Sequence, residues 1–111
     1  MKFLSRPEEL ILISVWRLGN EAYCVPIRQS ISEMSGKEWS FGAIYVPLNR
    51  LEKKGYLKST LGTPTRKRGG RSKRYYTLTK RGMFALSEVQ KLNEAVWIGV
   101  PVIPSDKPSS S

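Results

Sequence analysis

The chain has 111 residues, of which 40% are hydrophobic and 10% aromatic, enough for one domain with a modest core and too apolar for a wholly disordered chain. It contains no histidine, one cysteine and nine scattered carboxylates, which argues against a metal site, a cofactor and an enzyme. The formal net charge is +10.

The positive charge is concentrated in the middle third of the chain. Residues 50–81 contain twelve Lys or Arg and one acid, Glu52, whereas all other residues together contain seven cations and eight acids. Such a zone suits a polyanion, and nucleic acid is favoured over a membrane because no basic amphipathic anchor accompanies it. The sequence shows no bilayer-length apolar run and no secretory signal, and Cys24 stands alone. We therefore expect a cytoplasmic protein without membrane association.

The first predicted helix spans residues 5–19. Ser5 and Glu8 have the spacing of a capping box, Pro7 lies in the first turn, and Gly19 follows the last apolar residue. The apolar positions extend past the stripe that one core would cover. This helix is therefore expected to be buried on two sides, either by a second subunit or as a central core helix. These positions are Leu10, Ile11, Leu12, Ile13, Val15, Trp16 and Leu18.

Two further helices follow. Tyr23, Ile27, Ile31 and Met34 recur at helical spacing, Pro26 can open this helix, and residues 35–37 end it.

The third helix is predicted over residues 40–54. Ser40 is its N-cap, and Gly55 ends it. Its apolar stripe is formed by Ile44, Leu48 and Leu51. Pro47 lies seven residues in, where it predicts a kink or a delayed start of the helix.

The second half predicts a hairpin and a last helix. Residues 56–61 and 73–78 resemble strands, and the Gly-rich basic segment 62–72 between them resembles a long loop. Thr79 caps a helix reaching about Ile98, followed by a disordered Pro- and Ser-rich tail at 99–111. The apolar seam of this last helix has coiled-coil-like spacing and consists of Ala85, Val89, Leu92 and Val96, with Leu86 and Trp97 beside it.

This order predicts a mainly α fold with a two-stranded β-hairpin (α+β), α-α-α-β-β-α, which is a winged helix-turn-helix. One domain is expected over residues 1–98, with the wing at 57–78. In such folds the N-terminal part of the second helix of the pair meets base edges in the major groove.

The third helix supplies the candidates for base and phosphate contacts. Ser40, Gly42 and Ala43 are small enough for close approach to DNA, and Ala43 can touch a thymine methyl group. Tyr45 and Asn49 can form hydrogen bonds with a base or a phosphate, although Tyr45 is alternatively a half-buried core residue.

Cations at the end of this helix are candidates for phosphate contacts. Arg50, Lys53 and Lys54 either bind phosphate groups or form a solvated helix face.

The hairpin supplies the second set of candidates. Arginines beside a Gly-Gly turn suit a narrow minor groove or its flanking phosphates; the alternative is a cationic loop without a ligand. The loop candidates are Arg66, Lys67, Arg68, Gly69, Gly70 and Arg71, and the backbone-clamping candidates on the return strand are Lys73, Arg74 and Tyr75.

Four motifs in order carry a family resemblance. They are Gly42-Ala43-Ile44-Tyr45, Leu48-x-Arg50-Leu51-Glu52-Lys53-Lys54-Gly55, Gly69-Gly70-Arg71 with Lys73-Arg74-Tyr75-Tyr76, and Leu78-Thr79-Lys80-Arg81-Gly82. Over about residues 10–98 the chain resembles the PadR-like (phenolic acid decarboxylase regulator-type) winged-helix repressors. The family usually has proline directly after the motif tyrosine, whereas here Val46 precedes Pro47.

The resemblance implies a transcriptional regulator that binds double-stranded DNA. It implies a homodimer joined through the first and last helices, with residues 79–98 as the dimerisation helix, and a (pseudo)palindromic operator. Some relatives bind small aromatic effectors at the dimer interface, where Trp16 and Trp97 can line a pocket; alternatively, both tryptophans only pack the interface. Two other functions compete: a winged helix for protein–protein interaction, and an antitoxin- or phage-type DNA binder without an effector.

Overall fold

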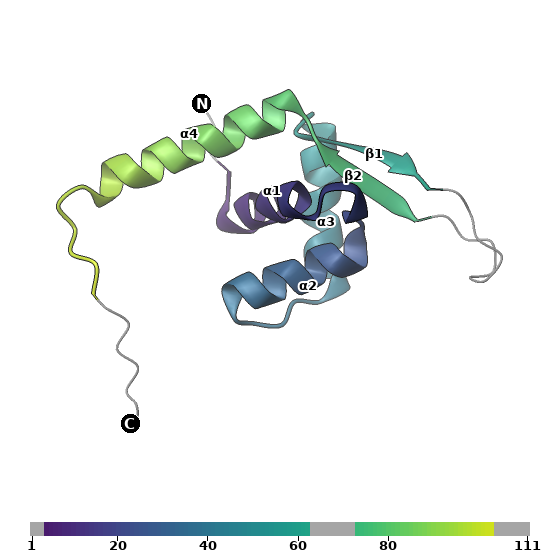
Figure 1. Ribbon diagram of the computed structural model, residues 1–111, viewed down its shortest axis with the longest axis horizontal. Coiled ribbons are helices and arrows are strands. Elements are labelled where there is room, and N and C mark those ends of the chain that lie inside the picture. The colour runs from purple at the N-terminus through teal and green to yellow at the C-terminus, as the bar shows by residue number, and fades with distance from the viewer. Residues whose placement is uncertain (1–3, 63–72, 104–111) are drawn as a thin grey trace, which may run out of the picture.

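The computed structural model describes residues 4–62 and 73–103, and it has the predicted order of elements (Figure 1). A short 3-10 turn, η1 (Gly19–Glu21), separates the first two helices. The regular elements are α1 (Arg6–Leu18), α2 (Cys24–Ser35), α3 (Phe41–Lys53), β1 (Leu57–Leu61), β2 (Arg74–Leu78) and α4 (Lys80–Trp97). The mainly α fold with a two-stranded antiparallel hairpin, α-α-α-β-β-α, is thereby confirmed.

The helices begin where the sequence places capping residues. Ser5 Oγ accepts a hydrogen bond from the Glu8 N–H, and the Glu8 carboxylate accepts one from the Ser5 N–H, so the predicted capping box of α1 is present. The side chains of Ser40 and Thr79 accept hydrogen bonds from the N–H groups of Ala43 and Gly82 at the starts of α3 and α4.

Helix α3 begins at Phe41, immediately after its cap. The predicted delayed start is therefore wrong, and Pro47 lies inside the helix. The first turn is held by the Ser40 cap, and proline removes only the N–H that would have bonded Ala43. The predicted kink stays a prediction.

The end of α3 leads directly into the hairpin. The N–H groups of Gly55 and Tyr56 donate to the carbonyls of Glu52 and Leu51, and Gly55 has a φ of 82°. This is a Schellman arrangement, in which the positive φ favours glycine. β1 then pairs with β2 in an antiparallel register that places Leu57 opposite Leu78 and Ser59 opposite Tyr76.

Helix α1 is the centre of the core. It contacts α2, α3, α4 and β2, and its Ile11, Leu12 and Val15 are buried. Burial by a second subunit stays a prediction, while within one chain the apolar residues of this helix are buried or partly buried. Trp16 is the exception, with 63% of its surface exposed.

Helix α4 packs at its beginning and runs away from the body (Figure 1). A Cβ at Gly82 would lie 2.3 Å from the Tyr56 carbonyl oxygen, so this residue lets α4 start against the α3–β1 connection. Val89 is buried, whereas Val96 and Trp97 near the end are exposed. Residues 100–103 form neither helix nor strand, and most of the tail predicted as disordered lies outside the described residues.

Candidate DNA-binding surface

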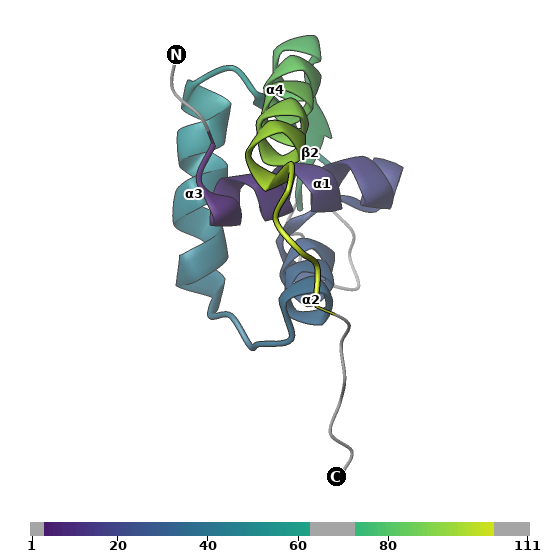
Figure 2. The ribbon, with the colours of Figure 1, turned by 90° about the vertical axis from the view of Figure 1, so that its left-hand side faces the viewer.

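Helix α3 has one face in the core and one face in solvent. Ile44, Leu48 and Leu51 are fully buried, as their spacing predicts. Gly42, Val46, Asn49 and Lys53 are exposed and share the opposite side of the helix. In Figure 2, α3 runs along one side of the molecule. Its exposed face is therefore accessible to a DNA duplex.

The predicted base-contacting residues lie on or beside this outward face. Ser40, Gly42, Ala43 and Asn49 are all exposed. A Cβ on Gly42 would meet nothing closer than Ser40 Oγ at 4.0 Å, so the backbone there is open to close approach. Tyr45 is 48% exposed, which leaves its side chain accessible to DNA and also fits the alternative of a half-buried residue.

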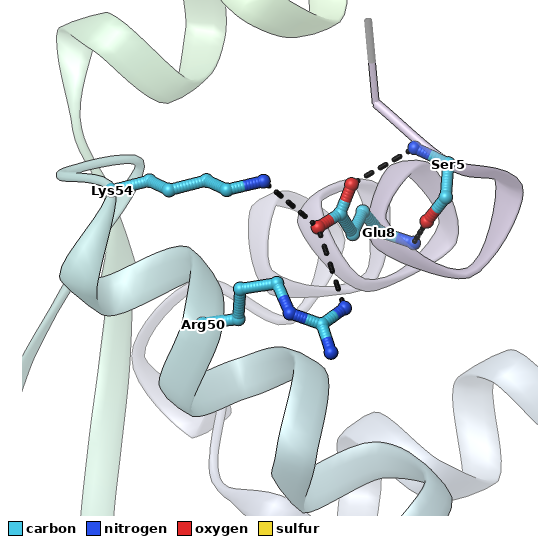
Figure 3. A network of polar contacts seen from close by, with 4 residues as sticks. All are labelled: Ser5, Glu8, Arg50 and Lys54. Atoms are coloured by element: carbon cyan, nitrogen blue, oxygen red, sulfur yellow. Dashed lines mark hydrogen bonds and ion pairs between the residues drawn. The ribbon is translucent and has the colours of Figure 1, made fainter. Parts of the chain in front are cut away.

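The cations at the end of α3 divide into two groups (Figure 3). Arg50 and Lys54 point to α1, where Nη1 of Arg50 and Nζ of Lys54 lie 3.9 and 3.3 Å from Glu8 Oε2. Glu8 is 4% exposed and its other oxygen, Oε1, accepts the Ser5 N–H. Lys53 is on the solvent side. Sequence reasoning missed this second role of Glu8, because helical spacing does not reveal a partner 46 residues away.

The environment of Glu8 changes its acidity. Burial by itself raises the pKa of this carboxyl, but hydrogen bonds from the Ser5 N–H and from Lys54 outweigh it and lower the pKa below its ordinary value of 4.5. Glu8 therefore stays ionised and keeps Arg50 and Lys54 beside the N-terminus of α1. Any contact of these two cations with phosphate must compete with this carboxylate.

Strand β2 and the residue before it contact Ala22 and Tyr23, which immediately precede α2. The Tyr76 N–H donates to the Ala22 carbonyl at 2.8 Å. The rings of Tyr23 and Tyr75 meet edge to face with centroids 5.4 Å apart, and Lys73 Nζ lies 4.2 Å from the Tyr23 centroid. Two of the predicted backbone clamps, Lys73 and Tyr75, thus contact one aromatic side chain, Tyr23, which the sequence analysis assigned only to the apolar pattern of the second helix.

The third predicted clamp is held by α3. Arg74 Nη1 donates to Ser59 Oγ at 2.9 Å, and Ser59 Oγ donates to Glu52 Oε2 at 2.6 Å. This chain of hydrogen bonds connects the return strand of the wing with the last turn of α3. Arg74 is still exposed, so it can reach a phosphate from a fixed position.

The turn between α2 and α3 is fixed by Arg28. Its Nε donates to the Trp39 carbonyl, and its guanidinium carbon lies 4.7 Å from the Phe41 ring centroid. Trp39 Nε1 in turn donates to Ser35 Oγ at 2.9 Å. These contacts position the N-terminal end of α3, and the sequence analysis missed them because they join residues of different elements.

The structure does not describe the loop candidates, and it places the two effector candidates on α1 and α4, away from α3. Arg66, Lys67, Arg68, Gly69, Gly70 and Arg71 lie outside the described residues. Trp16 borders an open hollow of about 220 Å³ between α1 and β2. Trp97 is at the far end of α4 and does not line this hollow.

Three helices, a hairpin after the third, and an exposed face on that third helix define a winged helix-turn-helix protein of the DNA-binding class. The sequence model of the PadR-like transcriptional regulator family matches residues 12–88. The chain belongs to this family, and is therefore a DNA-binding transcriptional regulator and not an enzyme. No helix in the described part of the chain is long and apolar enough to cross a membrane.

Solved structures support the assignment. The chain is 26% identical to a PadR family transcriptional regulator from Eggerthella lenta, with a TM-score of 0.65. The match covers 82% of the present chain and 77% of the Eggerthella chain. This protein is also 25% identical to a PadR-like transcriptional regulator from Bacillus cereus, with a TM-score of 0.67. That match covers 84% of the present chain and 85% of the Bacillus chain.

A third structure supports the fold alone. This is a transcriptional regulator from Clostridium thermocellum, at 23% identity, a TM-score of 0.68 and coverages of 84% and 87%. Among curated proteins no match was found.

Proposed function

We propose that this regulator binds a (pseudo)palindromic operator as a homodimer and represses transcription from it. The observation that carries the proposal is the outward face of α3, where Gly42, Val46 and Asn49 are exposed while the same helix is anchored in the core through Ile44, Leu48 and Leu51. A helix presented in this way fits the major groove, and a dimer places two of them on one duplex.

The dimer is proposed to form through α1 and α4. Trp16, Val96 and Trp97 have 63%, 57% and 54% of their surface exposed. Large apolar side chains that are exposed on helices are a common sign of a protein interface. Helix α4 extends beyond the body of the chain, where a second copy can pack on it (Figure 1). Residues 1–98 then bind DNA and dimerise, and residues 99–111 form a tail outside this unit.

Phosphate contacts complete the proposal. Lys53 is exposed on the outward face of α3, and Arg74 is exposed at the start of β2. The loop cations Lys67, Arg68 and Arg71 carry the minor-groove contact predicted for the wing. If a dimer makes roughly 6–10 phosphate contacts, its affinity falls by about three to five decades between 50 and 200 mM salt.

Selection of bound sequences from a random duplex pool tests this function directly. The expected result is an enriched two-fold symmetric site, with one protein dimer per duplex by light scattering and a steep loss of affinity with salt. Enrichment of no sequence by a monomeric protein would instead favour a protein–protein interaction module. Repression is tested separately by placing the selected site over a promoter with a reporter gene.

An aromatic effector is a further part of the proposal. Trp16 borders a hollow that is more apolar than polar, and in a dimer Trp97 of a second copy can approach it. Planar aromatic compounds are expected to quench tryptophan fluorescence, and the quenching should be lost in Trp97→Ala. A protein that represses normally and shows no quenching would fit the antitoxin- or phage-type alternative.

A further inference from the structure

Val46 is an aliphatic side chain at the centre of the DNA-facing side of α3. It is 55% exposed, although Ile44, two residues before it, is fully buried. At about 100° per residue, Val46 lies about 200° around the helix from Ile44 and so points nearly straight away from the core. No packing role within the described chain accounts for a β-branched residue there.

The residues around Val46 leave it accessible. Gly42 is one helical turn before it, and space for a Cβ at Gly42 is empty up to Ser40 Oγ at 4.0 Å. Asn49 follows three residues later and is exposed. The three residues form one line along the helix, in which a backbone without a side chain comes first, an isopropyl group second and an amide third.

The structure also changes which residue is suited to a methyl contact. Ala43, to which the sequence analysis assigned a thymine methyl group, lies about 100° from Ile44 on the flank of α3, by the same helical period. Its side chain is a single methyl group on the side facing α1, where Arg50 and Lys54 meet Glu8. Val46 is larger and more central, so it reaches deeper into a groove that receives this face.

Base chemistry then limits what Val46 can meet. The major-groove edges of guanine, adenine and cytosine present hydrogen-bonding groups, and thymine alone adds a methyl group. An isopropyl group placed on a donor or acceptor removes water from it without replacing the hydrogen bond, which is unfavourable. Placed on a thymine methyl group, it buries apolar surface on both sides.

We propose that Val46 is a specificity-determining residue that selects thymine at one position of each half-site by contact with its C5-methyl group. This inference rests on the proposed binding of an operator by α3 and names the base that this helix reads. The amide of Asn49 is placed to read the neighbouring base through hydrogen bonds, as asparagine does with adenine.

The experiment replaces each thymine of the selected half-site in turn by deoxyuridine, which lacks only the methyl group. At one position the affinity of the wild-type protein is expected to fall about fourfold, the equivalent of one buried methyl group. The Val46→Ala variant is expected to bind the intact site about fourfold more weakly and to lose nothing further with deoxyuridine at that position. If each change alone weakens binding equally, and both together weaken it no more than one alone, the Val46 side chain contacts that methyl group.

Two controls separate this contact from a general effect. Val25 on α2 is exposed to a similar degree, 52%, and Val25→Ala is expected to keep the wild-type sensitivity to deoxyuridine. Val46→Thr keeps the shape of the side chain and replaces one methyl group by a hydroxyl, so its preference for thymine should weaken while its thermal unfolding is unchanged.

Three outcomes overturn the inference. The wild-type protein can be indifferent to deoxyuridine at every position, or Val46→Ala can remain as sensitive as the wild type at the same position. In both cases the selected half-site still exists, so the proposed function stands and only the role of Val46 fails. If the selection enriches no half-site at all, the proposed function fails first and this inference with it.

Discussion

Leu48 and Val46 are two apolar residues on the same helix with opposite surroundings. Leu48 is fully buried against the core, whereas Val46 is 55% exposed. Hydrophobicity alone therefore does not tell which of them stabilises the fold and which is available to a ligand. The comparison shows that the inward face of α3 fixes the position of the helix. Residues on the outward face are not constrained by packing and are available for contact with DNA.

The largest expected effect comes from breaking the inward face. Leu48→Ala should lower the free energy of unfolding by about 2–5 kcal/mol, because it removes a fully buried side chain and leaves a cavity. Val46→Ala should change it by no more than about 0.5 kcal/mol, because an exposed side chain gains little from the fold. Urea denaturation of both variants measures the difference, and similar losses in the two would contradict the two-faced description of α3.

The flank of α3 that faces α1 is tested by Glu8→Ala. This change removes the contacts with Arg50 and Lys54 and the half of the capping box in which the carboxylate accepts the Ser5 N–H, and we expect a loss of about 1–2 kcal/mol in the free energy of unfolding. Glu8→Gln is the matched control, because glutamine can still accept the Ser5 N–H but carries no charge. It should lose no more than about 1 kcal/mol, since Arg50 and Lys54 are partly exposed and solvent screens their interaction. Equal losses in the two variants would show that the hydrogen bond from the Ser5 N–H contributes nothing beyond the charge of Glu8.

The same carboxyl predicts a pH dependence. Its pKa is lower in the folded protein than its ordinary value of 4.5, so its ionised form contributes stability above about pH 4.5, and this contribution is lost as the pH falls through the folded pKa. The difference in unfolding free energy between the wild type and Glu8→Gln should therefore be constant near neutral pH and shrink toward pH 3. A difference that grows on acidification would reverse the assigned direction.

The smallest expected effect is at Tyr76 of β2, in the hairpin that follows α3. The Tyr76 hydroxyl is buried and has no hydrogen-bond partner among the described residues, and burial raises the pKa of Tyr76 to about 12. Tyr76→Phe removes an unpaired polar group, so the unfolding free energy should stay unchanged or rise by up to about 1 kcal/mol. A loss of more than about 1 kcal/mol in thermal or urea unfolding would mean that the hydroxyl has a partner in solution.

Much of the fold was predictable because its signals are local. Capping residues such as Ser5, Ser40 and Thr79 act on N–H groups within three residues of themselves, and all three caps are present in the structure. The spacing of Ile44, Leu48 and Leu51 likewise reports burial directly, since residues three and four apart share one helix face. The delayed start that Pro47 suggested for α3 does not occur, because the Ser40 cap holds the first turn of the helix.

The candidate site was predictable in its location and less so in its contacts. Gly42, Asn49 and Lys53 are exposed on the third helix, as a groove-facing role requires. Arg50 was predicted to contact phosphate, yet it lies beside a buried carboxylate from the first helix. Lys73 was predicted as a backbone clamp, and its contact with the ring of Tyr23 was not foreseen.

By itself, the sequence determined the order of helices and strands, the family and the concentration of positive charge, because each of these depends on residue types at short, regular spacing. Only the tertiary structure decided which cations are held by the chain's own groups, that α1 is central to the core, and that Val46 points outward where Leu48 points inward. The physical reason is that contacts such as Lys54 with Glu8 or Arg74 with Ser59 join residues far apart in the chain, and their geometry exists only after the helices have packed.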